Sequence, residues 1–78
     1  MKILFRNLAR TTTEDELIRL FSAHGQIEYL TLVLDSNTGK SKGFGFVEMP
    51  DDTHARTAIK KLNGLTVANH KIRVKEAN

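Results

Sequence analysis

The fold of this chain is decided by one stretch, Lys42-Gly43-Phe44-Gly45-Phe46-Val47-Glu48-Met49. Side chains of a β-strand alternate between its two faces, so this stretch, taken as a strand, has two different faces. One face holds only uncharged residues: Gly43, Gly45, Val47 and Met49. The other face holds Lys42, Phe44, Phe46 and Glu48. Because an unpaired buried charge is costly, we expect the uncharged face in the core and both phenylalanines on the surface.

Three more strands are predicted by the same alternation, and each has one apolar face. Near the N-terminus, Ile3 and Phe5 alternate with Lys2, Leu4 and Arg6. In the middle of the chain, Leu30, Leu32 and Leu34 alternate with Tyr29, Thr31 and Val33. Near the C-terminus, Ile72 and Val74 alternate with Lys71, Arg73 and Lys75. In each strand the first set is expected in the core and the second set on an open face.

Two helices are predicted between these strands. Thr13 and Glu16 form a capping box that opens the first helix, and Gly25 is suited to follow its end. The second helix follows Pro50, with Asp51 or Asp52 as its cap, and ends at Asn63-Gly64. The apolar residues at helical spacing are Leu17, Leu20, Phe21, Ala55, Ala58, Ile59 and Leu62. Gly43 and Gly45 are expected to let a helix approach the sheet closely.

The resulting order is strand, helix, strand, strand, helix, strand. This order predicts an α+β fold, the ferredoxin-like βαββαβ sandwich. Right-handed crossovers place both helices on one face of a four-stranded antiparallel sheet and leave the other face open to water. No linker, repeat or low-complexity segment interrupts the pattern, so residues 1–78 are expected to form a single domain.

Composition narrows the class of protein further. A chain of 78 residues has room for one small core, and without cysteine no disulfide supports it. No apolar run approaches the roughly 18 residues of a membrane span, and the N-terminus enters a strand without a signal segment. We therefore expect a cytoplasmic protein without a membrane partner. A monomer is expected, although the sequence leaves the oligomeric state open.

Positive charge is concentrated on the sheet. The predicted strands and their loops hold seven Lys or Arg and four Asp or Glu, whereas the helices and their entries hold five of each. The open face thus combines two phenylalanines, two aliphatic residues and a ring of cations. Bases stack on aromatic rings and Lys or Arg meets phosphates, so this combination predicts binding of single-stranded nucleic acid.

The stretch that decides the fold also resembles the RNP1 octapeptide of RNA recognition motif (RRM) domains. Six of the seven specified positions match, with Met49 in place of the final aromatic residue. The stretch Ile3–Leu8 resembles the companion RNP2 hexapeptide, with Leu4 at the position that usually holds a surface aromatic. The whole chain is similar to small stand-alone RRM proteins of bacteria.

This resemblance implies an RNA-binding module for about two to four nucleotides of single-stranded RNA, with a post-transcriptional role. It implies that Phe44 and Phe46 stack bases, that Lys42 lies near phosphate, and that the backbone of residues 76–78 reads bases. Lys40 is expected to hold the strand from the side. The candidate RNA-binding residues are Lys2, Leu4, Arg6, Val33, Lys40, Lys42, Phe44, Phe46, Arg73 and Lys75.

Other functions remain open at this stage. The same face is suited to single-stranded DNA, and some RRM-like domains bind peptides instead. An acylphosphatase-like enzyme shares the topology and needs an Arg/Asn pair around a phosphate-binding loop after the first strand. Arg6-Asn7 is only a weak match to that pair. Gly39-Lys40-Ser41 is followed by a strand, unlike the helix of a phosphate-binding loop. We expect no catalytic residues, no metal site, no cofactor and no small-molecule substrate.

Overall fold

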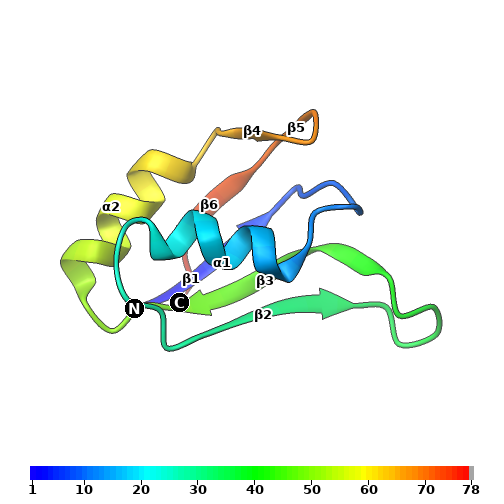
Figure 1. The fold of residues 1–78 in the computed structure, drawn as a ribbon, viewed down its shortest axis with the longest axis horizontal. Coiled ribbons are helices and arrows are strands. Elements are labelled where there is room, and N and C mark those ends of the chain that lie inside the picture. Colours follow the sequence, from blue (N-terminus) through cyan, green and yellow to red (C-terminus); the bar gives the residue numbers. More distant parts are fainter. Residues whose placement is uncertain (78) are drawn as a thin grey trace.

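The alternating and helical patterns form two helices and six strands in the computed structural model, which describes residues 1–77 (Figure 1). The main sheet contains β1 (Lys2–Arg6), β2 (Tyr29–Leu34), β3 (Ser41–Glu48) and β6 (Arg73–Glu76). The helices are α1 (Glu14–Ser22) and α2 (Asp52–Leu62). A separate two-stranded sheet contains β4 (Thr66–Val67) and β5 (His70–Lys71).

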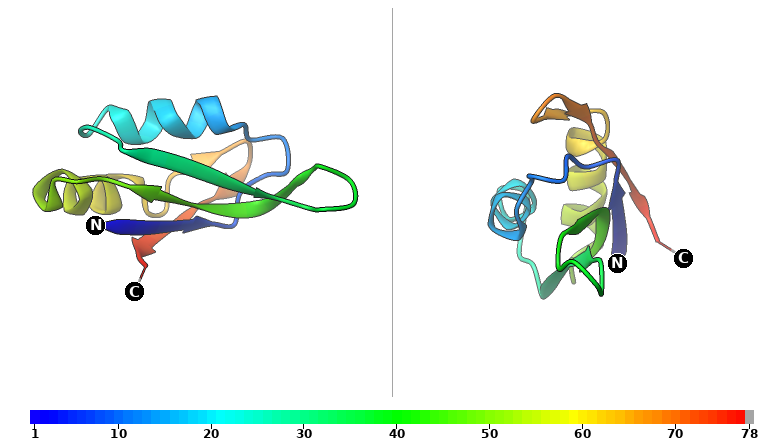
Figure 2. Two further views of the ribbon diagram at one scale, coloured as in Figure 1. Left: turned by 90° about the horizontal axis from the view of Figure 1, so that it is seen from below. Right: turned by 90° about the vertical axis from the view of Figure 1, so that its right-hand side faces the viewer.

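The main sheet is antiparallel, in the order β2-β3-β1-β6. Both helices lie on one side of this sheet, and its other side is open (Figure 2). The predicted α+β sandwich is therefore confirmed. Among residues 1–77, neither helix has the length and apolar character needed to cross a membrane.

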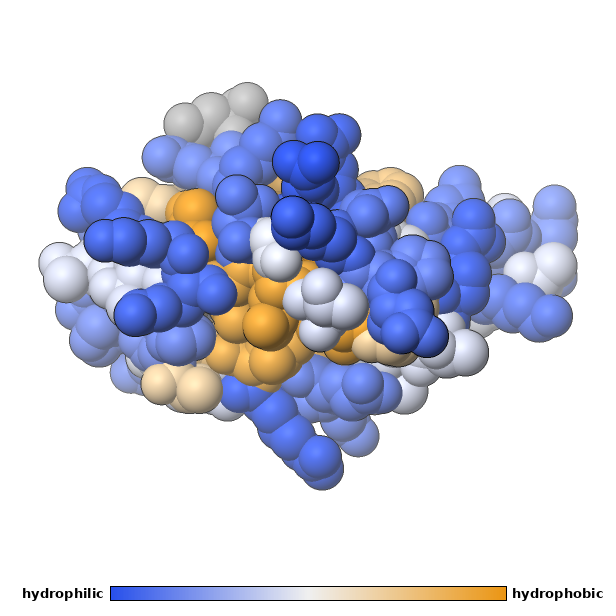
Figure 3. Space-filling model, turned by 90° about the horizontal axis from the view of Figure 1, so that it is seen from above, coloured by the Kyte–Doolittle hydropathy of each residue, from blue (hydrophilic) through white to orange (hydrophobic). Residues whose placement is uncertain are grey.

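The core lies between the sheet and the two helices. Its largest fully buried side chains come from both layers: Ile3, Phe5, Leu17, Phe21, Val47, Met49 and Ile72. The rings of Phe5 and Phe21 join β1 to α1, with centroids 5.6 Å apart. Seen from above, the surface shows an apolar area near its centre, surrounded by hydrophilic side chains (Figure 3).

Both helices begin where the sequence predicts. The capping box is present, because the Glu16 N–H donates to the Thr13 hydroxyl at 3.2 Å and the Glu16 carboxylate accepts from the Thr13 N–H. Asp51 is the cap of α2 and accepts from the N–H groups of Thr53 and His54. Helix α1 ends earlier than Gly25 suggests. The His24 N–H turns back to the Phe21 carbonyl at 3.0 Å, which tightens the last turn.

Two predictions about strands were wrong. Leu34 is 53% exposed instead of buried, because the register of β2 and β3 shifts after Leu32 and their hairpin extends beyond the helix layer (Figure 1). Lys71 does not continue the last strand of the main sheet. It pairs with Thr66 in the β4–β5 hairpin, whose turn residues Ala68 and Asn69 both have positive φ.

The two glycines of β3 have roles other than the predicted close approach of a helix. A Cβ on Gly45 would clash with the Thr31 carbonyl and lie 2.7 Å from the ring of Phe5, so Gly45 makes space for both. Gly43 has a φ of +84°, a conformation that favours glycine. Its carbonyl accepts from the Leu8 N–H at 2.9 Å, which ties β3 to the segment after β1.

Candidate nucleic-acid interface

Phe44 and Phe46 lie on the open face of β3, as the alternation predicts. Their neighbours Gly45 and Val47 are buried against the core, whereas both phenylalanines are partly exposed. The two ring centroids are 6.3 Å apart and the ring planes are at 85°. The rings therefore form an edge-to-face pair, so the two aromatic faces point in different directions.

A row of side chains crosses the whole sheet through Phe46. Thr31 of β2 pairs with Phe46, Phe46 pairs with Leu4 of β1, and Leu4 pairs with Lys75 of β6. Lys2 lies beside this row, with its Nζ 4.7 Å from the centroid of the Phe46 ring. An ammonium over an aromatic face is favourable, so Lys2 covers part of that face. Leu4 lies in the middle of the row, where an aromatic residue would have offered another stacking surface.

Two hollows adjoin this aromatic pair on the open face, and Leu4 and Phe46 line both of them. The larger hollow, of about 610 Å³, also contacts Arg6, Lys42 and Phe44. The smaller one, of about 370 Å³, has Lys2, Lys75 and the segment Glu76–Ala77 at its border. Each hollow thus has an apolar floor and at least two cationic side chains. Asn78, the last residue implied by the resemblance, lies outside the described residues.

Arg6 and Arg73 are paired residues on the neighbouring strands β1 and β6, and both are exposed. Together with Asn7 they line a further hollow of about 460 Å³. Two like charges at paired positions repel each other. An anion between them would offset this repulsion, which makes the pair a candidate phosphate contact.

Two of the sequence candidates are not part of this cluster. Lys40 lies in the β2–β3 hairpin and lines a different hollow, with Leu32, Leu34 and residues 10–13. Val33 is partly exposed at the register shift of β2 and borders neither hollow beside the phenylalanines. The structure therefore brings together Lys2, Leu4, Arg6, Lys42, Phe44, Phe46, Arg73 and Lys75.

Three polar residues that line the larger hollow were not among the sequence candidates: Asn7, Arg10 and His70. Asn7 has a φ of +62°, and its Nδ2 donates to the Lys71 carbonyl at 2.7 Å. Asn adopts this left-handed conformation more readily than most residues, which was the available signal. Arg10 was counted with the helices, and the hairpin that carries His70 was not predicted.

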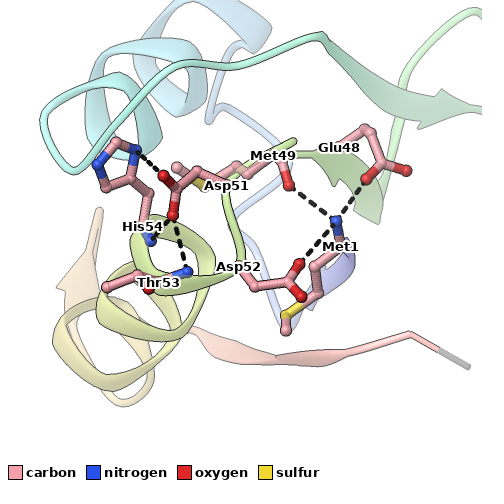
Figure 4. A network of polar contacts seen from close by, with 7 residues as sticks. All are labelled: Met1, Glu48, Met49, Asp51, Asp52, Thr53 and His54. Carbon is pink, nitrogen blue, oxygen red and sulfur yellow. Dashed lines mark hydrogen bonds and ion pairs between the residues drawn. The ribbon is translucent and has the colours of Figure 1, made fainter.

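The carboxylate of Glu48, at one end of the open face, is paired within the protein (Figure 4). The Met1 amino group donates to Glu48 at 2.7 Å and to the Met49 carbonyl at 2.8 Å, and it lies 3.6 Å from Asp52. This pairing joins the starts of β1 and α2 to the end of β3. It also offsets the acidic charge of Glu48 next to the cations of the sheet.

The Met1 amine predicts a pH dependence of stability in a chain that starts at this residue. Its hydrogen bond to Glu48 raises the pKa of the amine from its ordinary value of 8.0. A raised pKa in the folded state stabilises the fold fully below pH 8, and this contribution is lost as the pH rises through the folded-state pKa. The melting temperature of the wild-type protein should therefore fall above pH 8. The melting temperature of Glu48→Gln should fall less steeply over the same pH range. Parallel curves for both proteins would contradict this expectation.

Comparisons with known proteins agree with this geometry. The family model of the RNA recognition motif matches residues 3–73, and the chain belongs to this family. The glycine-rich RNA-binding protein 1 of Mycosarcoma maydis is 39% identical over 99% of the chain, which spans 44% of that protein. RbpE of Nostoc sp., named as an RNA-binding protein, is 35% identical over 99% of the chain, which spans 78% of RbpE. The resemblance to small bacterial RRM proteins is thus confirmed.

Solved structures show the same fold. The crystal structure of RNA-binding protein PG1 is 39% identical, with a TM-score of 0.94 over 99% of this chain and 93% of that one. A Sex-lethal protein in complex with RNA is 35% identical, with a TM-score of 0.94 over 99% of this chain and 46% of that one. Some curated relatives are much longer: the chain spans 17% of human RNA-binding protein 23.

Proposed function

We propose that this chain binds single-stranded RNA on the open face of its sheet. The observation that carries the proposal is the pair of partly exposed phenylalanine rings between two hollows that are bordered by Lys and Arg side chains. Exposed aromatic side chains serve as platforms for unpaired bases, and cations around them neutralise phosphates. Membership in the RNA recognition motif family and the RNA complex of a protein with the same fold support this assignment.

The hollows suggest how about two to four nucleotides would lie. One base stacks on Phe44 in the larger hollow, where Arg6 and Lys42 meet its phosphate. A second base stacks on Phe46. Leu4 lies next to both hollows and makes an apolar contact with each of the two bases. Lys2 covers part of the Phe46 ring in the free protein, so its ammonium moves from the ring to a phosphate when a base arrives. Arg73 and Lys75 hold the backbone along β6.

The biological side of the proposal follows from this chemistry. A small module that binds a few unpaired nucleotides is suited to a post-transcriptional role in the cytoplasm. Its partner is RNA, and its action is binding, without chemical change of the RNA. Single-stranded DNA is the alternative ligand that the same stacking surface favours, since every base has an aromatic face.

Binding of labelled oligonucleotides tests this proposal. Fluorescence anisotropy should show that single-stranded RNA binds more tightly than duplex RNA, because duplex bases are not free to stack. With about four phosphate contacts, log K against log salt should have a slope near −3, from about −0.7 per contact on a single strand. Equal affinity for duplex RNA, or a flat salt plot, would contradict the proposal. If single-stranded DNA binds more tightly than single-stranded RNA, the ligand is DNA instead of RNA.

A further inference from the structure

The larger hollow beside Phe44 has an outer wall that does not belong to the main sheet. Asn7 and Arg10 come from the segment that joins β1 to α1, and His70 comes from the β4–β5 hairpin. The side chain of Arg10 extends across Gly43, where a Cβ would lie 3.7 Å from its Nε. The hollow therefore continues past the aromatic pair and over the end of β1.

This wall is held in place by hydrogen bonds. Asn7 Nδ2 donates to the Lys71 carbonyl at 2.7 Å, which joins the segment after β1 to the β4–β5 hairpin. The Leu8 N–H donates to the Gly43 carbonyl at 2.9 Å, which joins the same segment to β3. His70 Nδ1 is 3.1 Å from the Ala68 carbonyl, so with the proton on Nδ1 its Nε2 is free to accept a hydrogen bond. Ties to two neighbouring elements pre-organise the wall.

The side chains that line the hollow carry positive charge and favour binding of an anion. Arg6 comes from β1, Lys42 from β3 and Arg10 from the segment after β1, and no Asp or Glu lines the hollow. None of the three takes part in a salt bridge among residues 1–77. Arg10 acts on the carboxylate of Asp35 only through a weak long-range attraction, the smallest of the causes that lower the pKa of Asp35. Three unpaired cations at one hollow repel each other unless a negative group joins them.

We propose that this outer wall is an additional nucleotide subsite, which rests on the proposed RNA-binding function. The nucleotide next to the base on Phe44 enters it. Arg10 and Lys42 hold the phosphodiester of this nucleotide. Asn7 and His70 offer hydrogen-bonding groups to its base or ribose. The footprint of the RNA thereby extends off the sheet, onto the segment after β1 and the β4–β5 hairpin.

Oligonucleotide length separates this subsite from the aromatic pair. We would measure Kd for a dinucleotide and an octanucleotide of uridine, both with 5′-hydroxyl ends so that every phosphate is internal. Arg10→Ala should weaken octanucleotide binding roughly tenfold and reduce the salt slope by about 0.7, the loss of one contact. The same variant should change dinucleotide binding much less. Arg56→Ala on α2, which borders none of the hollows on the open face, is the matched control and should behave as the wild type.

The outcomes distinguish the subsite from the proposed function. An unchanged octanucleotide Kd and salt slope for Arg10→Ala, with binding still lost on replacement of Phe44 and Phe46, would overturn the subsite alone. An equal loss for both oligonucleotides would also overturn it, since Arg10 would then act at the aromatic pair. His70→Ala provides a second check and should weaken only the octanucleotide. If no RNA binds the wild-type protein, the proposed function fails together with the subsite.

Discussion

Replacing Phe44 and Phe46 together by alanine is expected to weaken binding of single-stranded RNA by about a thousandfold. Base–aromatic stacking contributes about 1–3 kcal/mol per base. The loss of two rings at about 2 kcal/mol each corresponds to about three decades in Kd. Fluorescence anisotropy with a labelled octanucleotide measures this change.

The fold should survive the double replacement, because neither ring belongs to the buried core. Their mutual edge-to-face contact contributes only about 0.5–1.5 kcal/mol. Ile18 and Leu65 are apolar residues that are 37% and 38% exposed away from the sheet face, so replacing both by alanine controls for the loss of surface apolar area. Two outcomes would contradict the assignment of the buried and open faces of β3. One is a cooperative unfolding transition in the control but none in the double variant, and the other is RNA binding by both variants.

Phe5→Ala is expected to have the opposite signature, with loss of the fold itself. Phe5 is fully buried, and its ring packs on Phe21 and against Gly45. Truncation of a buried Phe costs about 3–5 kcal/mol, which is comparable to the whole net stability of a domain this small. Most of the variant should be unfolded at 25 °C, as measured by circular dichroism and urea titration.

The neighbouring residue gives the control for this variant. Leu4 precedes Phe5 in β1 but points to the open face, where it is only partly buried. Leu4→Ala should therefore leave a cooperative thermal transition and weaken RNA binding modestly. If Leu4→Ala unfolds the protein while Phe5→Ala remains folded, β1 has the opposite orientation from the one described.

The sequence predicted the layers because two short-range patterns are strong in it. Charges on alternate positions of β3 leave only one orientation that avoids buried ions, and this places Phe44 and Phe46 on the surface. The capping box at Thr13 marks the start of α1 to the residue. Both are local rules, so neither depends on how distant segments meet.

What the sequence did not predict depends on contacts between distant segments. The β4–β5 hairpin has strands of only two residues, too short to show an alternating pattern. Arg10 and Asn7 reach the hollow beside Phe44 because Leu8 and Lys71 tie separate elements together. Leu34 is exposed because a register shift carries the hairpin beyond the helices. None of these arrangements follows from the residue types alone.

The planes of the two rings are at 85°, and two hollows lie beside them on the open face. A base that stacks on Phe44 approaches from a different direction than one on Phe46, and the cations divide accordingly between Arg6 with Lys42 and Lys2 with Lys75. In the proposed binding mode, successive bases therefore turn relative to each other as the strand crosses the sheet.

The central claim is that both rings contact bases, and NMR of the complex tests it most directly. With a labelled protein and a short single-stranded RNA, we expect nuclear Overhauser contacts between the ring protons of Phe44 and Phe46 and base protons. Amide shifts should concentrate in β1, β3 and β6. Saturating RNA that produces no contacts to either ring, with shifts confined to α1 and α2, would contradict the account.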